Sequence, residues 1–489
     1  MDTHHFIAFD FGAESGRCIL GSLSNNKISL REISRFPTGM MTVGEHFHWN
    51  IFRLYEEMKK SLRICAAEKV NIESMALDTW GVDYSLVASD GSILSVPYAY
   101  RDPRTNGAME SLFKIMPREK IYELTGIQFL QLNTLFQLHA QKKDKSPLLD
   151  VATDLLFMPD TFNYLFTGIK KSEFTFATTS QLYNPVKKNW DPEIFKALGI
   201  NIDIMQDIVK PGTVLGDLSE RICKETGIDH MLVTAVASHD TGSAIVSIPA
   251  EDENFAYISS GTWSLMGIET HEPIISDKSL KYNFTNEGGA EGTFRFLKNI
   301  MGLWLVQECK HAWASKNYTY PQLVEIAQEA EPFKCLIDPD ANDFLNPENM
   351  PEAIRNYCKK TGQPVPDSDA QIVRCVFESL ALKYREVMDQ LKELAVKPIN
   401  KLHIIGGGTQ NELLCQYAAN ATGVQVVTGP AEATATGNIM MQALALGYVK
   451  SLPEIRKIIK NSFDYKTYQP QKTADWNNAY HKFLSIINK

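Results

Sequence analysis

The sequence predicts an α/β protein built from two similar domains, and three observations support this prediction. A strand, a small Gly/Ser turn and a second strand occur at residues 6–20, and the same design returns at residues 255–267. Between them, residues 232–245 read as a strand followed by the start of a helix. The length of 489 residues leaves room for two large domains. The repeated design therefore implies duplicated domains that face each other across a cleft.

The composition is that of an ordinary soluble globular protein. Hydrophobic residues make up 44% of the chain and charged residues 22%, and the net charge is -9. Because no basic tract is present to neutralise phosphates, we do not expect nucleic acid as a partner. No apolar run is long enough to cross a membrane, and the first residues lack the pattern of a signal peptide. We therefore expect a cytoplasmic protein with no membrane partner.

The eight cysteines are scattered and include no C-x-x-C pair. This usage is typical of reduced thiols packed in a core, and a disulfide between Cys358 and Cys375 is not favoured. Glu45, His46 and His48 resemble a metal-binding cluster, but alternation in a short surface strand explains them better.

The first hairpin carries an acidic residue, Asp10, near its tip. Gly12, Ser15 and Gly16 would let backbone N–H groups approach a phosphate, although a plain hairpin turn also uses such residues. An aspartate inside an apolar strand must be paired or must bind something, so we favour a functional role for Asp10.

The segment after the hairpin is predicted to contain a strand at 28–36, a helix at 51–70 and a strand from Ile72. The last of these ends in polar residues around Gly81. There Asp78 and Asp83 could accept hydroxyl protons from a sugar, or the region could be a simple hairpin. Residues 110–200 are predicted to be mostly helical, with one helix starting at Met158–Pro159.

The strand predicted at the start of residues 232–245 ends close to Asp240, which places this residue at the edge of the sheet. Ligands of open α/β sheets bind at the carboxyl ends of strands, and a helix N-terminus there offers N–H donors to phosphate. An acid at this point can hold a metal ion or take a proton. Capping of the following helix is an equally expected role for Asp240.

The second half opens with a polar linker at 249–254, where we expect a domain boundary. A helix is predicted from Asn299 to Gln307, which would place these two residues roughly 12 Å apart along its axis. One could then contact a sugar and the other a nucleotide, or both could be polar positions on an amphipathic helix. Further predictions are a helix at 367–394, a strand, glycine turn and helix at 402–411, and a closely packed helix at 439–446.

Taken in their order along the chain, these motifs resemble those of the carbohydrate kinases of the glycerokinase, xylulokinase and gluconokinase family. That family lies within the actin-like ATPase superfamily. The resemblance covers essentially the whole chain. The matching positions are Asp10, Gly12, Ser15 and Arg17 for the first phosphate motif, 260–262 for the second, 406–408 for the nucleotide glycines and Asp240 for the catalytic aspartate. Glu14 departs from the pattern, since a small residue is usual there, and this puts in doubt only the local contacts of the loop.

The resemblance implies two actin-like (ribonuclease H-like) domains flanking a catalytic cleft, with a sugar-binding domain at 1–246 and a nucleotide-binding domain at 247–489. It implies transfer of the γ-phosphoryl group of ATP to O1 of L-rhamnulose. The alternatives are a kinase for another ketose, such as L-fuculose or D-xylulose, and an actin-like ATPase that is not a kinase.

The resemblance also assigns roles to particular residues. Asp240 would be the catalytic base, and Asp10 would orient Mg²⁺ through water. The residues expected to hold ATP are Ala13, Glu14, Ser15, Gly16, Arg17, Thr262, Gln307 and Gly407. The residues expected to line the sugar pocket are Gly81, His239, Asp240, Thr241 and Asn299. We expect a monomer or a homodimer.

Overall fold

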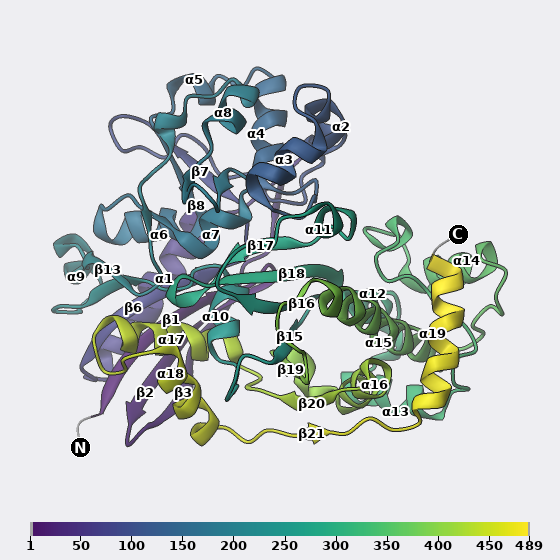
Figure 1. The fold of residues 1–489 in the computed structure, drawn as a ribbon. Coiled ribbons are helices and arrows are strands. Elements are labelled where there is room, and N and C mark those ends of the chain that lie inside the picture. Colours follow the sequence, from purple (N-terminus) through teal and green to yellow (C-terminus); the bar gives the residue numbers. More distant parts are fainter. Residues whose placement is uncertain (1–2, 488–489) are drawn as a thin grey trace. The chain divides into compact units, whose positions relative to one another are not determined.

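A computed structural model describes residues 3–487, which form two compact units (Figure 1). Unit 1 comprises Met1–Glu251, Glu269–Phe296 and Ala433–Ser462, and unit 2 comprises Asp252–Ile268, Leu297–Glu432 and Phe463–Lys489. The expected boundary between residues 246 and 247 lies close to the end of the first segment of unit 1. Two later segments return to unit 1, so neither unit is a continuous half of the chain.

The sheet of unit 1 has six strands in the order β13-β14-β6-β1-β2-β3. Their bounds are β1 His4–Phe11, β2 Ser15–Ser24, β3 Lys27–Pro37, β6 Ile72–Thr79, β13 Thr213–Asp217 and β14 Leu232–Ala235. β1 and β2 form the predicted antiparallel hairpin, and β6 pairs in parallel with both β1 and β14. The carboxyl ends of β1, β6 and β14 therefore meet at one edge of the sheet.

The two faces of this sheet contact different helices. Ile7 and Phe9 of β1 belong to an apolar cluster that also contains Leu54 of α1 (Ile51–Ala67). In the neighbouring strand, the Ser74 hydroxyl donates to Gln442 of α17 (Ala433–Ala445) at 2.6 Å. Alternation of side chains along β1 and β6 thus gives one apolar face and one face with buried polar contacts.

Unit 1 also contains shorter elements, most of them between residues 84 and 226. The helices are α2 Ala108–Phe113, α3 Arg118–Thr125, α4 Thr134–Lys143, α5 Leu148–Val151, α6 Met158–Thr167, α7 Phe174–Thr179, α8 Pro192–Leu198, α9 Glu220–Thr226, α10 Asp240–Val246, α11 Asp277–Lys281 and α18 Leu452–Ser462. The strands are β4 Met41–Val43, β5 His46–His48, β7 Tyr84–Val87, β8 Asp154–Phe157, β9 Ser172–Glu173, β10 Tyr183–Asn184, β11 Asn189–Trp190, β12 Ile208–Val209 and β17 Thr285–Gly288. The helical character predicted for 110–200 and the helix start at Met158 are confirmed.

Unit 2 is built on the strand run β18-β16-β15-β19-β20-β21. The strands are β15 Phe255–Ser260, β16 Trp263–Thr270, β18 Phe294–Met301, β19 Lys401–Ile405, β20 Gln425–Thr428 and β21 Thr467–Tyr468. Its helices are α12 Trp304–Ala312, α13 Tyr320–Glu329, α14 Met350–Lys360, α15 Asp369–Leu394, α16 Glu412–Thr422 and α19 Thr473–Ile487.

Both sheets repeat one topology, as the duplicated hairpins predicted. In unit 1 the hairpin β1–β2 is followed by β6, which pairs in parallel with β1. In unit 2 the hairpin β15–β16 is followed by β19, which pairs in parallel with β15. The orders β3-β2-β1-β6-β14 and β18-β16-β15-β19-β20 are therefore equivalent.

The predicted helix from Asn299 to Gln307 is wrong at its start. Asn299 lies on strand β18, and α12 begins only at Trp304. Gly302 separates the two elements at a tight contact, since a Cβ atom there would lie 2.5 Å from the backbone carbon of Trp263. This contact comes from the β15–β16 turn, which is distant in sequence, so local periodicity could not reveal it. The axial spacing expected for a single helix does not apply.

The expected packing of most cysteines in the core is confirmed. All eight cysteines are free, and seven of them are buried. His46 and His48 lie on the short hairpin β4–β5, and the acidic and imidazole groups of residues 3–487 form no metal-ligand cluster there. Within the same range, no helix has the length and apolar character needed to cross a membrane.

Candidate active site

The first turn of unit 1 holds Asp10 against an arginine. The hairpin register places Asp10 opposite Arg17, whose Nη2 donates to Asp10 Oδ2 at 2.5 Å. Asp10 is only 7% exposed, so this pairing offsets the cost of burying its charge. The backbone N–H of Gly12 donates to the Ser15 carbonyl at 3.0 Å, which closes the turn.

The remaining residues of this turn are consistent with a backbone surface for a phosphate. Gly16 must lack a side chain, because a Cβ atom there would lie 2.5 Å from the Phe36 ring. Ala13 and Ser15 are partly exposed. Glu14 is exposed, so its carboxylate is free to face solvent.

Three carboxylates lie at or beyond the carboxyl ends of parallel strands of unit 1. Asp10 is paired in register with Asp78 on β6, and Asp240 begins α10 after β14. Asp78 is fully buried, and its Oδ2 accepts a hydrogen bond from Asn438 of α17 at 2.6 Å. Its Oδ1 is buried and has no hydrogen-bond partner among residues 3–487. This edge of the sheet is therefore rich in oxygen ligands.

The carboxylates at this edge of the sheet favour the binding of a proton or a cation. Burial raises the pKa of Asp78 well above its ordinary value, and the charges of Asp10 and Asp240 act in the same direction. The pKa of Asp240 is also raised, first by desolvation and further by Asp10, while His239 and Thr241 oppose the shift. A raised pKa makes a carboxylate a better proton acceptor near neutral pH.

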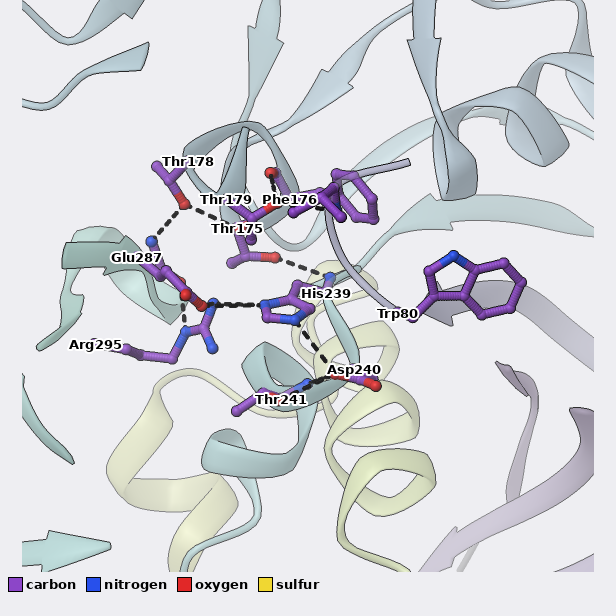
Figure 2. Close-up of polar contacts among 12 residues, drawn as sticks. Trp80, Thr175, Phe176, Thr178, Thr179, His239, Asp240, Thr241, Glu287 and Arg295 are labelled. Carbon is purple, nitrogen blue, oxygen red and sulfur yellow. Dashed lines mark hydrogen bonds and ion pairs between the residues drawn. The ribbon is translucent and has the colours of Figure 1, made fainter. Parts of the chain in front are cut away.

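His239 and Asp240 adjoin at the start of α10, as Figure 2 shows. His239 is the N-cap residue of α10, and Asp240 is the first residue of the helix. Asp240 therefore does not have the capping role considered for it. Asp240 Oδ1 accepts from the backbone N–H of Thr241 at 2.5 Å and from its hydroxyl at 3.0 Å. His239 Nε2 lies 3.4 Å from the same oxygen. The Asp240 side chain is nevertheless 33% exposed and can meet a ligand.

A buried ion pair lies on the other side of the His239 ring (Figure 2). Glu287 Oε2 is 3.3 Å from His239 Nδ1 and 3.1 Å from Arg295 Nη2. Arg295 is fully buried, and its Nε donates to the Gly288 carbonyl at 2.7 Å. Burial alone would raise the pKa of Glu287, but Arg295 and His239 lower it below its ordinary value. Glu287 is therefore a fixed negative charge that orients the imidazole.

Four of the five predicted sugar residues belong to unit 1. A Cβ atom at Gly81 would lie 3.3 Å from His239 Nε2 and 3.5 Å from the Thr179 hydroxyl, so the glycine keeps space beside the imidazole. Thr241 is buried and adjoins Asp240. Asn299 is partly exposed on β18 and belongs to unit 2.

Asp83 is bonded within the protein, which does not favour the sugar contact considered for it. It is fully buried, and its carboxylate accepts hydrogen bonds from the indole N–H groups of Trp49 and Trp80 at 2.6 and 3.0 Å. Gln137 and the backbone N–H of Tyr100 donate at 2.9 and 3.2 Å. Three of these donors bond Oδ2 and one bonds Oδ1, so the buried carboxylate is held by the protein itself.

In unit 2, the turn of the second hairpin meets the start of α12. The Gly261 carbonyl accepts from the N–H of Leu303 at 3.0 Å. The Thr262 carbonyl accepts from the N–H groups of Gly302 and Trp304, each at 3.1 Å. These bonds place Thr262 beside the first turn of α12, the helix that carries Gln307.

The glycine turn of unit 2 packs against the same hairpin. A Cβ atom at Gly408 would lie 2.0 Å from Ser260 Oγ, and Gly406 has a φ of +84°. Gly407 is exposed, with no described heavy atom within 4 Å of its Cβ position. Gln307 has a buried Oε1 with no partner in the described part of the chain. Unit 2 thus has exposed glycine backbone at Gly407 and, at Gln307, a buried amide oxygen without a partner among residues 3–487.

Comparison with known proteins gives the family. Residues 5–247 match the model of the FGGY family of carbohydrate kinases, N-terminal domain, and residues 256–446 match the C-terminal domain of the same family. The chain belongs to the FGGY family of carbohydrate kinases.

Similar proteins extend over the full length of this carbohydrate kinase. It is 47% identical to the rhamnulokinase of Bacteroides thetaiotaomicron over 483 residues, which cover 99% of each chain. It is 43% identical to the rhamnulokinase of Oceanobacillus iheyensis, covering 94% of this chain and 97% of the relative. Among solved structures, the xylulose kinase of Lactobacillus acidophilus has the same fold, with a TM-score of 0.82, 16% identity and coverage of 99% and 98%.

Several residues at the site of this kinase were not assigned from its sequence. Neither Glu287 nor Arg295 was given a role from the sequence. Asn438, which donates to Asp78, lies far along the chain on α17. The signal present in the sequence is an acidic residue, Glu287, directly before the glycine pair Gly288-Gly289.

Proposed function

We propose that this kinase transfers the γ-phosphoryl group of ATP to O1 of L-rhamnulose and releases L-rhamnulose 1-phosphate and ADP. Support for the sugar comes from the curated relatives, which are named rhamnulokinases and match over nearly the whole chain. Support for the chemistry comes from one observation above all. A partly exposed aspartate with a raised pKa, Asp240, stands beside an oriented histidine at the end of a central strand.

In this proposal Asp240 accepts the proton of the sugar O1 hydroxyl. The raised pKa favours that step, and the hydrogen bonds from Thr241 fix the carboxylate in one orientation. Phosphoryl transfer passes through a loose transition state, so positioning of the reacting groups supplies much of the catalysis. Gly81, His239, Thr241 and Asn299 would line the sugar pocket.

The residues proposed to hold ATP form two groups. Ala13, Glu14, Ser15, Gly16 and Arg17 would contribute one phosphate loop, and Thr262, Gln307 and Gly407 would contact the remainder of the nucleotide. The buried carboxylates Asp10 and Asp78, with one unpartnered oxygen among them, fit a hard cation such as Mg²⁺. Asp10 would hold this ion through water, and the ion would neutralise charge on the phosphates.

The domain roles follow from these assignments. Residues 1–246 would be the sugar-binding domain and would also supply the first phosphate loop, and residues 247–489 would be the nucleotide-binding domain that carries Thr262, Gln307 and Gly407. We further propose a cytoplasmic protein that is a monomer or a homodimer.

The testing experiment is a coupled assay of ADP release with Mg-ATP and a panel of ketoses, including L-rhamnulose, L-fuculose and D-xylulose. We expect a strong preference for L-rhamnulose, and detection of L-rhamnulose 1-phosphate in the product. A preference for another ketose would retain the mechanism and replace the substrate. ADP release without any sugar, unchanged when a ketose is added, would contradict the kinase proposal.

A further inference from the structure

Three cysteines of unit 2 form a buried cluster that the kinase reaction does not use. The Sγ atoms of Cys335, Cys358 and Cys375 all lie within 4.8 Å of one another. The three residues are 1%, 0% and 2% exposed. They come from three separate elements, namely the segment between α13 and α14, helix α14 and helix α15. Three thiols from three elements thus converge on one point.

The spacing of the sulfur atoms suits a metal ion bound by thiolates. Zinc–sulfur bonds of about 2.3 Å place the sulfurs of a tetrahedral site about 3.8 Å apart. From an upper limit of 4.8 Å, the cluster needs a contraction of no more than about 1 Å to reach that geometry. A rotation about side-chain bonds can supply this without moving the helices. The three cysteines are the one group of three or more metal-ligating side chains this close together in residues 3–487.

Two lysines lie near the cluster. The positive charges of Lys482 and Lys334 act on Cys335 in the direction that favours a thiolate. Thiolates, and not thiols, are the metal ligands, so these charges assist metal binding.

The segment that carries Cys335 is held firmly in place. The N–H of Phe333 donates to Glu378 at 2.8 Å, and the N–H of Ile337 donates to Ser379 at 2.9 Å, both on α15. Gln363 accepts from the N–H of Leu336 at 2.9 Å and donates to its carbonyl at 2.7 Å.

Helix α19 secures the same segment from another direction. Lys482 Nζ donates to the carbonyls of Phe333 and Lys334 at 2.9 and 3.2 Å. Partners outside the ligand set that fix ligand positions are characteristic of working metal sites.

We propose that Cys335, Cys358 and Cys375 form a structural binding site for a thiophilic metal ion, for which Zn²⁺ is the probe. Three thiolates and Zn²⁺ leave one negative charge, which Lys482 and Lys334 face. Soft sulfur ligands select Zn²⁺ or Cu⁺ over Mg²⁺, so this site would not compete for the ion used with ATP. Bound metal would join α14, α15 and the segment before α14 into one cross-linked body.

The test uses the full chain, purified with a reductant and freed of metal by a chelator. Zn²⁺ is titrated in competition with a chromophoric chelator, and Co²⁺ is added separately to detect thiolate-to-metal charge transfer in the near ultraviolet. We expect one equivalent of Zn²⁺ bound per chain, a higher melting temperature with Zn²⁺ and a charge-transfer band with Co²⁺. Failure of the wild-type protein to bind Zn²⁺, or a disulfide within the cluster under these reducing conditions, would overturn the proposal.

Variants identify the ligands. Cys335→Ser, Cys358→Ser and Cys375→Ser should each weaken Zn²⁺ binding by about 100-fold or more and remove the charge-transfer band. Cys309→Ser is the matched control, because Cys309 is also buried in unit 2 but lies outside the cluster. Equal Zn²⁺ affinity in the Cys335→Ser and Cys309→Ser proteins would contradict the assignment even if both are less stable than wild type. Neither result depends on kinase activity.

Discussion

Asp240 illustrates at the scale of one residue how neighbours give a carboxylate its role. Desolvation and Asp10 raise its pKa, whereas Thr241 fixes one of its oxygens through two hydrogen bonds. The Asp240 carboxylate therefore binds a proton more readily than an ordinary aspartate does, and its orientation is fixed. Neither property belongs to an exposed aspartate.

The first prediction concerns Asp240→Asn. An amide cannot accept the sugar proton, so kcat should fall by roughly 10²–10⁴-fold while L-rhamnulose still binds. Steady-state kinetics and calorimetric sugar binding measure the two quantities separately. An unchanged kcat would remove Asp240 from the role of base, and loss of binding alone would make it a sugar ligand only.

A second prediction concerns the ion pair beside His239. Glu287→Gln leaves the buried guanidinium of Arg295 without its carboxylate, and breaking such a pair costs about 3–5 kcal/mol of folding stability. The double variant Glu287→Gln/Arg295→Met should lose less stability than the sum of the single changes. Urea unfolding of the four proteins measures this coupling. Additive losses would show that the two side chains act independently.

The third prediction uses the pH dependence caused by Asp83. Burial raises the pKa of Asp83 to about 6 in the folded protein. Because the folded pKa exceeds the unfolded one, its contribution to stability is fully present below pH about 4 and is lost as pH rises through about 6. Relative to Asp83→Asn, which cannot titrate, wild type should therefore lose roughly 3 kcal/mol between these pH values. Urea unfolding at several pH values tests this, and parallel curves for the two proteins would contradict it.

At the scale of elements, α10 is positioned by close packing against α17. A Cβ atom at Gly437 of α17 would lie 1.8 Å from the Ser243 carbonyl oxygen of α10. The sequence predicted a closely packed helix here from its small residues, and the structure confirms it, although α17 starts at Ala433 and not at Ile439.

The fourth prediction follows from this contact. Gly437→Ala forces α10 and α17 apart, which should cost about 1–3 kcal/mol of stability and lower kcat because Asp240 begins α10. Thermal unfolding and kinetics are the measurements. Gly39→Ala is the control, since no heavy atom among residues 3–487 lies within 4 Å of its Cβ position. Equal melting temperatures for the two variants would contradict close packing at Gly437.

Elements with strong local patterns were predictable from the sequence, and elements defined by distant contacts were not. The hairpin at Asp10 and the strand before Asp240 contain apolar runs bounded by small turn residues, and these local patterns were sufficient to predict both elements. The strand at Asn299 was mistaken for helix because its end is set by the turn at Trp263. Likewise, the sequence left the role of Asp83 open, because the two indoles that donate to it are brought there only by the fold.

The convergence of the three cysteines could not be predicted for the same reason. Each thiol looked like an isolated core residue, and no C-x-x-C spacing pointed to a ligand set. Their meeting depends on how the segment at Cys335 packs against α14 and α15.

For the whole molecule, the sugar and the nucleotide should protect different segments of the chain. We predict that L-rhamnulose slows amide hydrogen exchange in α10 of unit 1, whereas a non-hydrolysable ATP analogue slows it at 260–262 and 406–408 of unit 2. Hydrogen exchange followed by mass spectrometry of peptides provides the measurement. Sugar protection confined to unit 2 would overturn the proposed domain roles.

The third segment of unit 1 also determines when that unit can finish folding on the ribosome. Strands β1 and β6 are synthesised early, but Gln442 and Asn438, which bond the Ile7 carbonyl and the Asp78 carboxylate, emerge near the end of translation. Until then these buried polar groups lack their native partners. The first segment of unit 1 must therefore remain incompletely folded while most of unit 2 is synthesised. A gene fragment that ends at residue 251 should consequently yield an unstable polypeptide, even though it encodes every strand of the first sheet.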